Sequence, residues 1–482
     1  MAFAQTAEAA NSQLNENIMG SPADLPGDFV NSKKSAYMPL PEIPFFQALL
    51  AMLSGIAFIL LSTLRWRIHA FYGLLGACLV TGLCAGMPLV TALDTAKEGF
   101  GRIIRSLCFI IVLGTTLGVL LEQNGSTAIM ARIILQKTGR EKPARAMGLV
   151  GLLVGLPIFC DSGFIVLSGL ARQLSRRTGV ALLPIVSSLA VGLYSVHCLL
   201  PPHPGASAAA GALGVDMGKL ILYGLLVAIP AMLAGLVWTR FASKGRDGAA
   251  PSFAAAADEE SSLPAWQAFA PVAVPILLIA LRAVLVPAGG VLPDWKKILQ
   301  AAGDPAVALG IGILFALIPY RKTSVQSPKQ VVRESVEKAG AILVIIGAGG
   351  AFGAILTQLH PEKYFTNMAF MLRMGIIFPF LLAFVLKTAQ GSSTVAIITA
   401  ASLVQPLLPA LGLDSSAGRL LATLSMGAGS MAISHANDAY FWVIVKFSGL
   451  ELDRVLRVYS LATLWMGCTA LGVVYLLSRF LI

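Results

Sequence analysis

The first candidate functional residue is an acidic side chain inside an apolar segment. Asp161 follows Gly155, Pro157 and Cys160 and precedes Gly163. A carboxylate at the centre of a membrane costs about 2.5 to 3.5 kcal/mol, so it normally faces a cavity or a partner. Pro157 and the flanking glycines interrupt a helix and free backbone groups to line such a cavity. Asp161 is therefore a candidate proton-coupling residue near the tip of a re-entrant hairpin; capping of a half-helix is the alternative.

The second polar interruption is a proline-rich turn. Between Pro201 and Pro204, three of four residues are proline, so a helix cannot continue and the chain is extended with exposed carbonyl groups. His203 is held within this turn and is a candidate substrate-binding residue. His197 precedes it in an apolar run. For His197, packing and cavity lining remain equally open.

The third interruption offers an anion-binding site. Ser392, Ser393 and Thr394 follow Gly391 and precede a fresh apolar run, a pattern that predicts the start of a half-helix. The free N–H groups and the positive end of the helix dipole at such a start favour a carboxylate. We therefore expect these three side chains to bind the carboxylate of a substrate. Lys387 has two open roles, pairing with that anion or extending its ammonium to a membrane interface.

The fourth interruption is the densest group of polar side chains. Ser434, His435, Asn437 and Asp438 stand almost consecutively in an otherwise apolar stretch. An Asp beside a His can exchange a proton as a cavity alternates between wet and closed, because burial disfavours the charged carboxyl group. Asp438 and His435 are thus candidate proton-coupling residues, and Asp438 ranks above Asp161. Ser434 and Asn437 are candidate substrate contacts.

The elements that position these residues follow from an apolar composition. Of 482 residues, 56% are hydrophobic and only 12% are charged, and the mean hydropathy is +0.79. A soluble chain carries about 25% charged residues, so this is an integral membrane protein. At ~20 residues per crossing, the apolar content supplies roughly a dozen spanning helices. A soluble enzyme and a single-pass receptor are excluded. The long apolar runs also argue against an outer-membrane barrel, whose strands alternate apolar and polar residues.

The net charge of +11 comes from basic clusters between the apolar segments. Short cytoplasmic loops carry such an excess of Lys and Arg, and no basic patch interleaved with aromatic residues predicts nucleic-acid binding.

The six cysteines lie within or beside apolar segments without metal-ligand spacing, so no metal site or disulfide framework is predicted. No Gly-x-x-x-x-Gly-Lys-Ser/Thr loop occurs, which argues against ATP-driven transport, and no cofactor is expected.

Polar segments divide the chain. Residues 1–43 lack signal-peptide features and are predicted to be a disordered polar tail. Residues 240–262 form the longest internal polar linker. This divider separates two predicted transmembrane parts, residues 44–239 and 263–482.

The two transmembrane parts resemble each other. Residues 114–123 match residues 349–358 at a constant offset of 235 residues. Transporters are often built from such repeats, which carry broken segments at corresponding places around a midplane site. The sequence therefore predicts an all-α polytopic membrane protein with about 12 transmembrane segments in two inverted repeats, with re-entrant or broken helices.

Three motifs connect the chain to a known family. They are Pro201-Pro202-His203-Pro204-Gly205, Gly391-Ser392-Ser393-Thr394-Val395-Ala396, and Ser434-His435-Ala436-Asn437-Asp438 with Phe441-Trp442. In this order and at these separations, the chain resembles the gluconate:proton symporter family of bacterial inner-membrane permeases from about residue 45 to the C-terminus. The resemblance implies a two-repeat fold of the ion-transporter superfamily type. It also implies proton-coupled uptake of gluconate or a related sugar acid or hydroxy-carboxylate across the inner membrane.

Other functions remain as alternatives. Asp161 stands where many members of this family have Glu, which leaves the substrate open to another organic anion or amino-acid-like acid such as glycerate, D-serine or citrate. An intramembrane aspartyl protease with Asp161 and Asp438 is a weaker alternative, because Asp216 lacks the Gly-x-Gly-Asp arrangement. A passive channel is disfavoured by two separate interrupted segments. The expected partners are a small organic acid, protons and the lipid bilayer; a homo-oligomer is compatible with the sequence.

Overall fold

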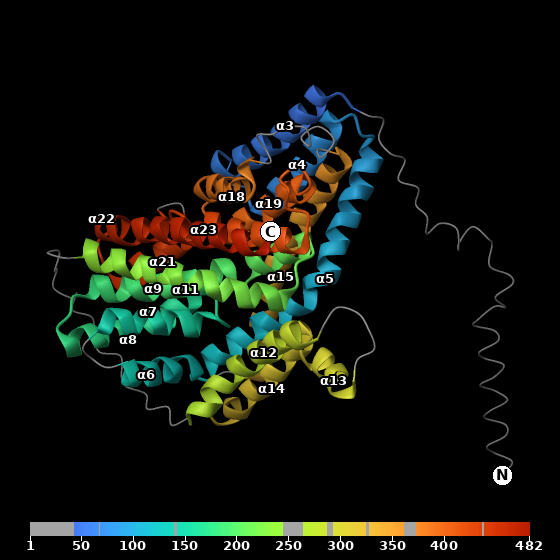
Figure 1. Cartoon of the computed structure of the whole chain (residues 1–482). Helices are drawn as coiled ribbons and strands as arrows, with labels where there is room; N and C mark the ends of the chain where they lie inside the picture. The colour runs from blue at the N-terminus through green and yellow to red at the C-terminus, as the bar shows by residue number, and fades with distance from the viewer. Residues whose placement is uncertain are drawn as a thin grey trace, which may run out of the picture. The chain divides into compact units, whose positions relative to one another are not determined.

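The computed structural model describes residues 43–66, 68–138, 142–243, 264–286, 293–323, 327–360, 373–435 and 438–482 (Figure 1). The predicted tail and nearly all of the predicted linker lie outside these ranges. Every regular element within them is a helix, so the all-α prediction is confirmed for the described residues.

The helices before the predicted linker are α3 (Phe45–Leu64), α4 (Ala70–Cys84), α5 (Leu89–Gln123), α6 (Ser126–Thr138), α7 (Pro143–Gly155), α8 (Cys160–Thr178), α9 (Leu182–Leu199), α10 (Pro204–Leu213) and α11 (Met217–Ala242). Those after it are α12 (Ala265–Leu285), α13 (Asp294–Ala302), α14 (Pro305–Thr323), α15 (Pro328–Gln358), α18 (Ile377–Gln390), α19 (Ser393–Val404), η1 (Gln405–Leu407), α20 (Ser416–Met431), α21 (Ala439–Ser448), α22 (Leu452–Val455), η2 (Leu456–Ser460) and α23 (Leu461–Leu481).

Fewer helices than predicted are long enough to cross a membrane by themselves. In the described ranges, six have the required length and apolar composition: Leu89–Gln123, Leu182–Leu213, Met217–Ala242, Ala265–Leu285, Lys329–Gln358 and Leu452–Leu481. The pair α13 and α14, bent by 72°, makes a seventh if it is counted as one span. The prediction of about 12 segments is not confirmed, because other apolar stretches form shorter helices of 10–17 residues.

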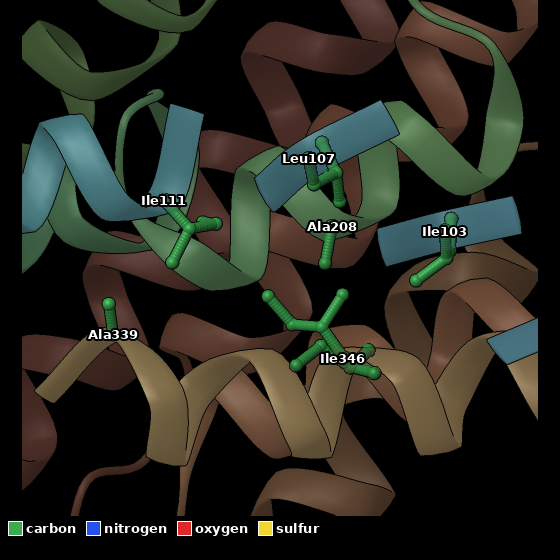
Figure 2. Packing of buried hydrophobic residues seen from close by; sticks show 7 residues of the cluster. Ile103, Leu107, Ile111, Ala208, Ala339 and Ile346 are labelled. Carbon is green, nitrogen blue, oxygen red and sulfur yellow. The ribbon is translucent and has the colours of Figure 1, made fainter. Parts of the chain in front are cut away.

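Small residues bring the two longest helices, α5 and α15, into close contact. A Cβ atom built on Gly99 would lie 2.5 Å from the Gly350 carbonyl oxygen, so the backbones touch there. Further along, an apolar cluster joins this pair to α10 and α19 (Figure 2). Its buried members are Ile103, Leu107, Ile111, Ala208, Ala339, Ile346 and Ile398. The cluster therefore fixes α10 and α19, which carry two of the polar interruptions, against the long helices.

Two helical hairpins carry polar turns. α7 ends at Gly155 and α8 begins at Cys160, and Figure 1 shows the two helices side by side. α18 and α19 likewise pack together around a turn at Gly391. Gly391 has a φ of 78°, a left-handed conformation that only glycine adopts at little cost, so α18 ends there.

Two other helices are interrupted within the protein. α9 ends at Leu199 because the prolines that follow cannot continue it, and α10 resumes at Pro204. α20 ends at Met431, and α21 begins at Ala439 with Asp438 as its N-cap. The breaks predicted from the proline-rich turn and from the polar group around Asp438 are both present.

The helix boundaries repeat along the chain. α5 ends at Gln123 and α15 at Gln358, an offset of 235 residues, and the same offset separates the starts of α10 and α21 and those of α11 and α22. The contacts correspond as well, because α10 packs on α19 while α21 packs on α8. Each interrupted helix thus contacts the hairpin of the other half.

Candidate functional site

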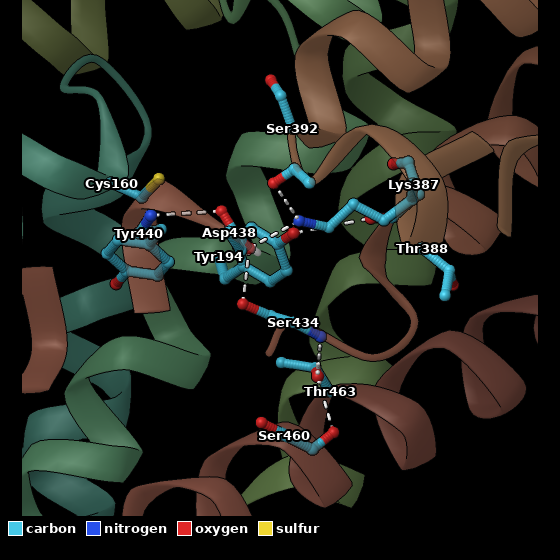
Figure 3. Close-up of polar contacts among 12 residues, drawn as sticks. Cys160, Tyr194, Lys387, Thr388, Ser392, Ser434, Asp438, Tyr440, Ser460 and Thr463 are labelled. Atoms are coloured by element: carbon cyan, nitrogen blue, oxygen red, sulfur yellow. Dashed lines mark hydrogen bonds and ion pairs between the residues drawn. The ribbon is translucent and has the colours of Figure 1, made fainter. Parts of the chain in front are cut away.

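A buried ion pair lies where the α18–α19 hairpin meets α21. Lys387 Nζ is 2.5 Å from Asp438 Oδ2 and donates a hydrogen bond to the Gly391 carbonyl oxygen at 2.9 Å (Figure 3). The Lys387 side chain is fully buried, and only 7% of the Asp438 side chain is exposed. Two charges leave water at acceptable cost only when they pair closely. Of the two roles left open for Lys387, extension to a membrane interface is therefore excluded.

Two further donors hold the Asp438 carboxylate. The Ser434 hydroxyl donates to Oδ2 at 2.5 Å, and the Tyr440 backbone N–H donates to Oδ1 at 3.1 Å, which caps α21. The Ser434 N–H donates in turn to Thr463 Oγ1 at 2.9 Å, and the Thr463 hydroxyl donates to the Ser460 carbonyl oxygen at 2.8 Å. The extended chain between α20 and α21 is thereby tied to α23.

Tyrosine rings form one wall of the site. The Tyr194 and Tyr440 rings stack with centroids 5.5 Å apart, and Tyr459 meets Tyr440 edge-on at 6.0 Å. Lys387 Nζ lies 6.0 Å from the Tyr194 centroid, within the range of a cation–π contact. Aromatic rings thus border the ion pair on this side.

Two histidines lie behind this wall. His203 is the N-cap residue of α10, and its Nε2 lies 2.8 Å from the Gly155 carbonyl oxygen at the end of α7. Its ring centroid is 4.9 Å from that of His197, which stacks on Tyr194 at 6.2 Å. Both side chains are buried. His203 therefore joins the first hairpin to the first interrupted helix, and His197 connects it to the tyrosine wall.

The tip of the first hairpin contributes an acid to the same region. Asp161 lies in the first turn of α8, where it interacts electrostatically with Asp438 and Lys387. The Cys160 thiol lies 4.0 Å from Asp161 Oδ1. Among the described residues, no cationic side chain lies within ion-pair distance of Asp161. The site thus contains one paired and one unpaired carboxyl group.

The start of α19 has the geometry predicted for an anion site. Ser392 is the N-cap residue, and its hydroxyl accepts a hydrogen bond from the Val395 N–H at 3.4 Å. The N–H groups of Ser393 and Thr394 have no acceptor within the helix, as at any helix start. Ser393 is buried, and Thr394 is half-buried. Free donors therefore lie inside the protein at this point.

His435 and Asn437 are the two remaining predicted residues beside Asp438. Asn437 lies outside the described residues. His435 is half-buried, and its backbone carbonyl accepts from the Asp438 N–H at 2.8 Å. In the part of the chain that is described, no hydrogen bond joins the His435 ring to the Asp438 carboxylate. Direct proton exchange between these two side chains thus lacks a contact in this conformation.

Sequence reasoning missed several members of the site. The pairing of Lys387 with Asp438 joins residues far apart in the chain, and the tyrosines resemble ordinary core residues in an apolar run. Gln390 is a different case, because it directly precedes the predicted anion site. Its side-chain nitrogen and oxygen are both buried without a hydrogen-bond partner among the described residues. A buried polar group without a partner is costly, so Gln390 is an additional candidate substrate contact.

The interrupted helices and buried polar site define a polytopic helical membrane transporter. The chain matches the GntP family permease model over residues 47–480 and belongs to that family. The gluconate permease of Pseudomonas aeruginosa is 34% identical over 445 residues, covering 89% of this chain and 97% of that protein. The high-affinity gluconate transporter of Escherichia coli K12 is 31% identical over 434 residues, covering 87% and 96%.

A solved structure also matches. The YdaH transporter of Alcanivorax borkumensis aligns with a TM-score of 0.61 at 15% identity, covering 91% of this chain and 99% of that one. At this identity the match concerns the fold. Family membership confirms the resemblance found in the sequence, and the relatives are named permeases and transporters, so this chain is a membrane transporter and not a protease or another enzyme.

Proposed function

We propose that this transporter carries gluconate, or a related small sugar acid or hydroxy-carboxylate, inward across the bacterial inner membrane together with protons. The observation that carries the proposal is the meeting of three features in one buried region. These are the free helix start at Ser393, the neutral Lys387–Asp438 pair and the unpaired acid Asp161. The names of the relatives support gluconate as the first substrate to test.

The substrate carboxylate binds at the start of α19. Lys387 is already engaged by Asp438, whereas this helix start offers N–H groups and hydroxyl groups to a carboxylate. Ser392, Ser393 and Thr394 surround this start, and half-helix ends serve the same purpose in other transporters. Gln390 lies beside it, and neither the nitrogen nor the oxygen of its side-chain amide has a hydrogen-bond partner among the described residues.

The substrate hydroxyl groups bind the polar groups opposite this helix start. His203, Ser434 and Asn437 are the residues proposed for this role. The Cβ position of Gly205, two residues after His203, is only 3.2 Å from the Thr394 Cα atom, which supports proximity of α10 to the carboxylate site. Substrates that share a carboxylate but differ in hydroxyl pattern are thus distinguished on the α10 and α21 side.

Asp161 carries the proton in preference to Asp438. Asp438 is balanced by Lys387 and held by Ser434 and the Tyr440 N–H, so its charge is compensated within the protein. Asp161 has no such partner in the described part of the chain. An unpaired carboxylate is costly to bury, whereas a neutral carboxyl group is much less so. A proton that enters with the substrate removes this cost. His435 takes part through its electrostatic interaction with Asp438.

The two halves, residues 44–239 and 263–482, form inverted repeats that alternate access to the site. The recurring offset of 235 residues and the reciprocal contacts of α10 with α19 and α21 with α8 support this arrangement. The basic clusters around Arg132 and Arg172 lie on the cytoplasmic side by the positive-inside rule.

The test is uptake of labelled gluconate by purified protein in liposomes. With an inside-alkaline pH gradient, we expect saturable accumulation that a protonophore abolishes. Competition by unlabelled glycerate, citrate, D-serine and other sugar acids ranks the substrates. Uptake that neither saturates nor responds to the gradient contradicts symport. If only a non-sugar acid competes efficiently, that acid and not gluconate is the substrate.

A further inference from the structure

A second cavity lies between α5, α10, α15 and α19, away from the ion pair. Its volume is about 130 Å³, on the order of ten times the roughly 10–15 Å³ that one water needs, so it admits a small organic molecule. Glycines on three of these helices line it, which lets a ligand approach the backbone. The polar side chains in its lining are Arg102, Ser106, Thr357, Ser402 and Gln405.

The lining of this cavity fits a hydroxy-carboxylate. Arg102 forms no ion pair or hydrogen bond within the described residues, so its guanidinium is available to an anion. Arginine binds carboxylates through two parallel N–H groups. The Gln405 amide offers both a donor and an acceptor for hydroxyl groups. The Ser402 and Thr357 hydroxyls donate to backbone carbonyls at 2.6 and 2.8 Å, which leaves their oxygens free to accept.

Helix α19 borders both the cavity and the central site. Ser393 stands at the start of this helix, and Ser402 is nine residues further on, about 13 Å along the axis. α10 packs alongside, with His203 at its start and Gly211 in the cavity lining. One helix pair therefore reaches from the central site to the second cavity.

Two unpartnered hydroxyl groups lie along this helix pair. Ser207 on α10 and Thr399 on α19 are both fully buried, and neither hydroxyl has a hydrogen-bond partner among the described residues. Leaving a buried hydroxyl unpaired costs about 1–3 kcal/mol, so such groups call for an explanation. Because α10 and α19 touch near these groups in this structure, a polar molecule that contacts them when alternating access separates the two helices provides one.

We propose that the cavity at Arg102 is a vestibule subsite for the transported acid. The substrate carboxylate binds Arg102, and its hydroxyls bind Gln405 and Ser402. The substrate reaches the start of α19, past Ser207 and Thr399, when alternating access separates α10 from α19, which are in close contact in this structure. This inference rests on the proposed function, because it takes the same class of substrate.

The test compares two cavity variants with matched controls in the liposome uptake assay. Arg102→Gln removes the cation, and Arg105→Gln removes the next arginine of α5, which does not line the cavity. Gly353→Ala places a methyl group 3.4 Å from Ser402 and 3.6 Å from Gln405 Oε1, an ordinary contact that narrows the cavity; Gly340→Ala adds a methyl group on the same helix with nothing within 4 Å.

We expect Arg102→Gln to raise the KM for gluconate about tenfold, as for loss of a charged contact, with the maximal rate within about twofold of the unaltered protein. Gly353→Ala is expected to raise KM about threefold, which corresponds to a loss of under ~1 kcal/mol of binding free energy. Both controls should leave KM unchanged. The assay is run in neutral phosphatidylcholine vesicles and in vesicles that also contain phosphatidylglycerol.

Three outcomes overturn the subsite. One is equal KM values for Arg102→Gln and Arg105→Gln, and another is a lowered maximal rate with unchanged KM. The third is an Arg102 effect confined to vesicles with anionic lipid, which assigns the arginine to a lipid headgroup. In all three the unaltered protein still transports, so the proposed function stands; absence of uptake by the unaltered protein removes the proposed function and the subsite together.

Discussion

Lys387 and Asp438 form a buried ion pair that joins the last turn of α18 to the first residue before α21. The two residues are separated by 51 positions, so the pair fixes a hairpin tip to an interrupted helix that the chain reaches much later. Because the Lys387 ammonium also binds the Gly391 carbonyl, the same contact stabilises the turn before the proposed carboxylate site. The pair is therefore a structural support of that site.

Removal of one partner of this pair should destabilise the protein strongly. Lys387→Met leaves the Asp438 carboxylate buried without its cation, which costs about 3–5 kcal/mol. The double variant Lys387→Met/Asp438→Leu removes both charges and should recover most of that loss. Thermal unfolding of the purified variants in detergent measures the effect. The structural role of the ion pair is contradicted if Lys387→Met is as stable as the unaltered protein. It is also contradicted if the double variant is no more stable than Lys387→Met.

The start of α19 should determine affinity for every accepted acid. Ser393→Ala and Thr394→Ala each remove a donor worth about 1–3 kcal/mol, so we expect each to raise KM by a similar factor for all substrates. Thr116→Ala is the control, because its hydroxyl donates to the Val112 carbonyl within α5 and is not part of the α19 start. Uptake titrations with several sugar acids provide the comparison. If the variants change the order of preference but leave the shared affinity intact, the carboxylate binds elsewhere.

Backbone contact between α7 and α9 should make one glycine indispensable. A Cβ atom on Gly192 would lie 2.1 Å from the Gly148 carbonyl oxygen, whereas nothing lies within 4 Å of the Cβ position of Gly169. Gly192→Ala must separate the two helices and is expected to cost several kcal/mol or prevent folding, since overpacking costs about 1–3 kcal/mol or more. Gly169→Ala should be neutral. Size-exclusion profiles and thermal unfolding compare them; equal stability refutes the close approach.

The turn between α18 and α19 should depend on backbone conformation. Gly391 adopts a φ of 78°, which costs an ordinary residue about 1–2 kcal/mol but Asn less. Gly391→Val is therefore expected to lower the unfolding temperature and raise KM, and Gly391→Asn to retain most of both properties. Similar behaviour of the two variants in the same assays shows that side-chain size, not φ, governs the turn.

The local breaks of the helices were predictable from the sequence. Pro201 to Pro204 stop α9, and Gly391 followed by Ser392 ends one helix and caps the next; each signal acts within a few residues. The number of spans was not predictable, because hydropathy registers an apolar stretch without distinguishing a full crossing from one arm of a hairpin. Helices such as α18 and α19 are as apolar as a span but shorter.

The central pairing was also beyond sequence reasoning. Lys387 lies on α18 and Asp438 before α21, and only packing of these elements decides whether the lysine binds the acid, the substrate or the interface. Within the described residues, the same packing places no cationic side chain at ion-pair distance from Asp161, which is why we propose Asp161 ahead of Asp438 as the proton carrier. Polar side chains were located from sequence, but their partners required the fold.

The most direct measurement is gradient-driven accumulation by Asp161→Asn in liposomes, with exchange of labelled for unlabelled gluconate measured in parallel. We predict that this variant loses accumulation under an inside-alkaline gradient while it retains exchange, because the neutral amide replaces only the protonated form of the acid. Asp94→Asn, which alters an exposed residue paired with Lys97, is the control and should accumulate normally. Accumulation by Asp161→Asn equal to that of the unaltered protein would contradict the assignment of the coupling proton to Asp161.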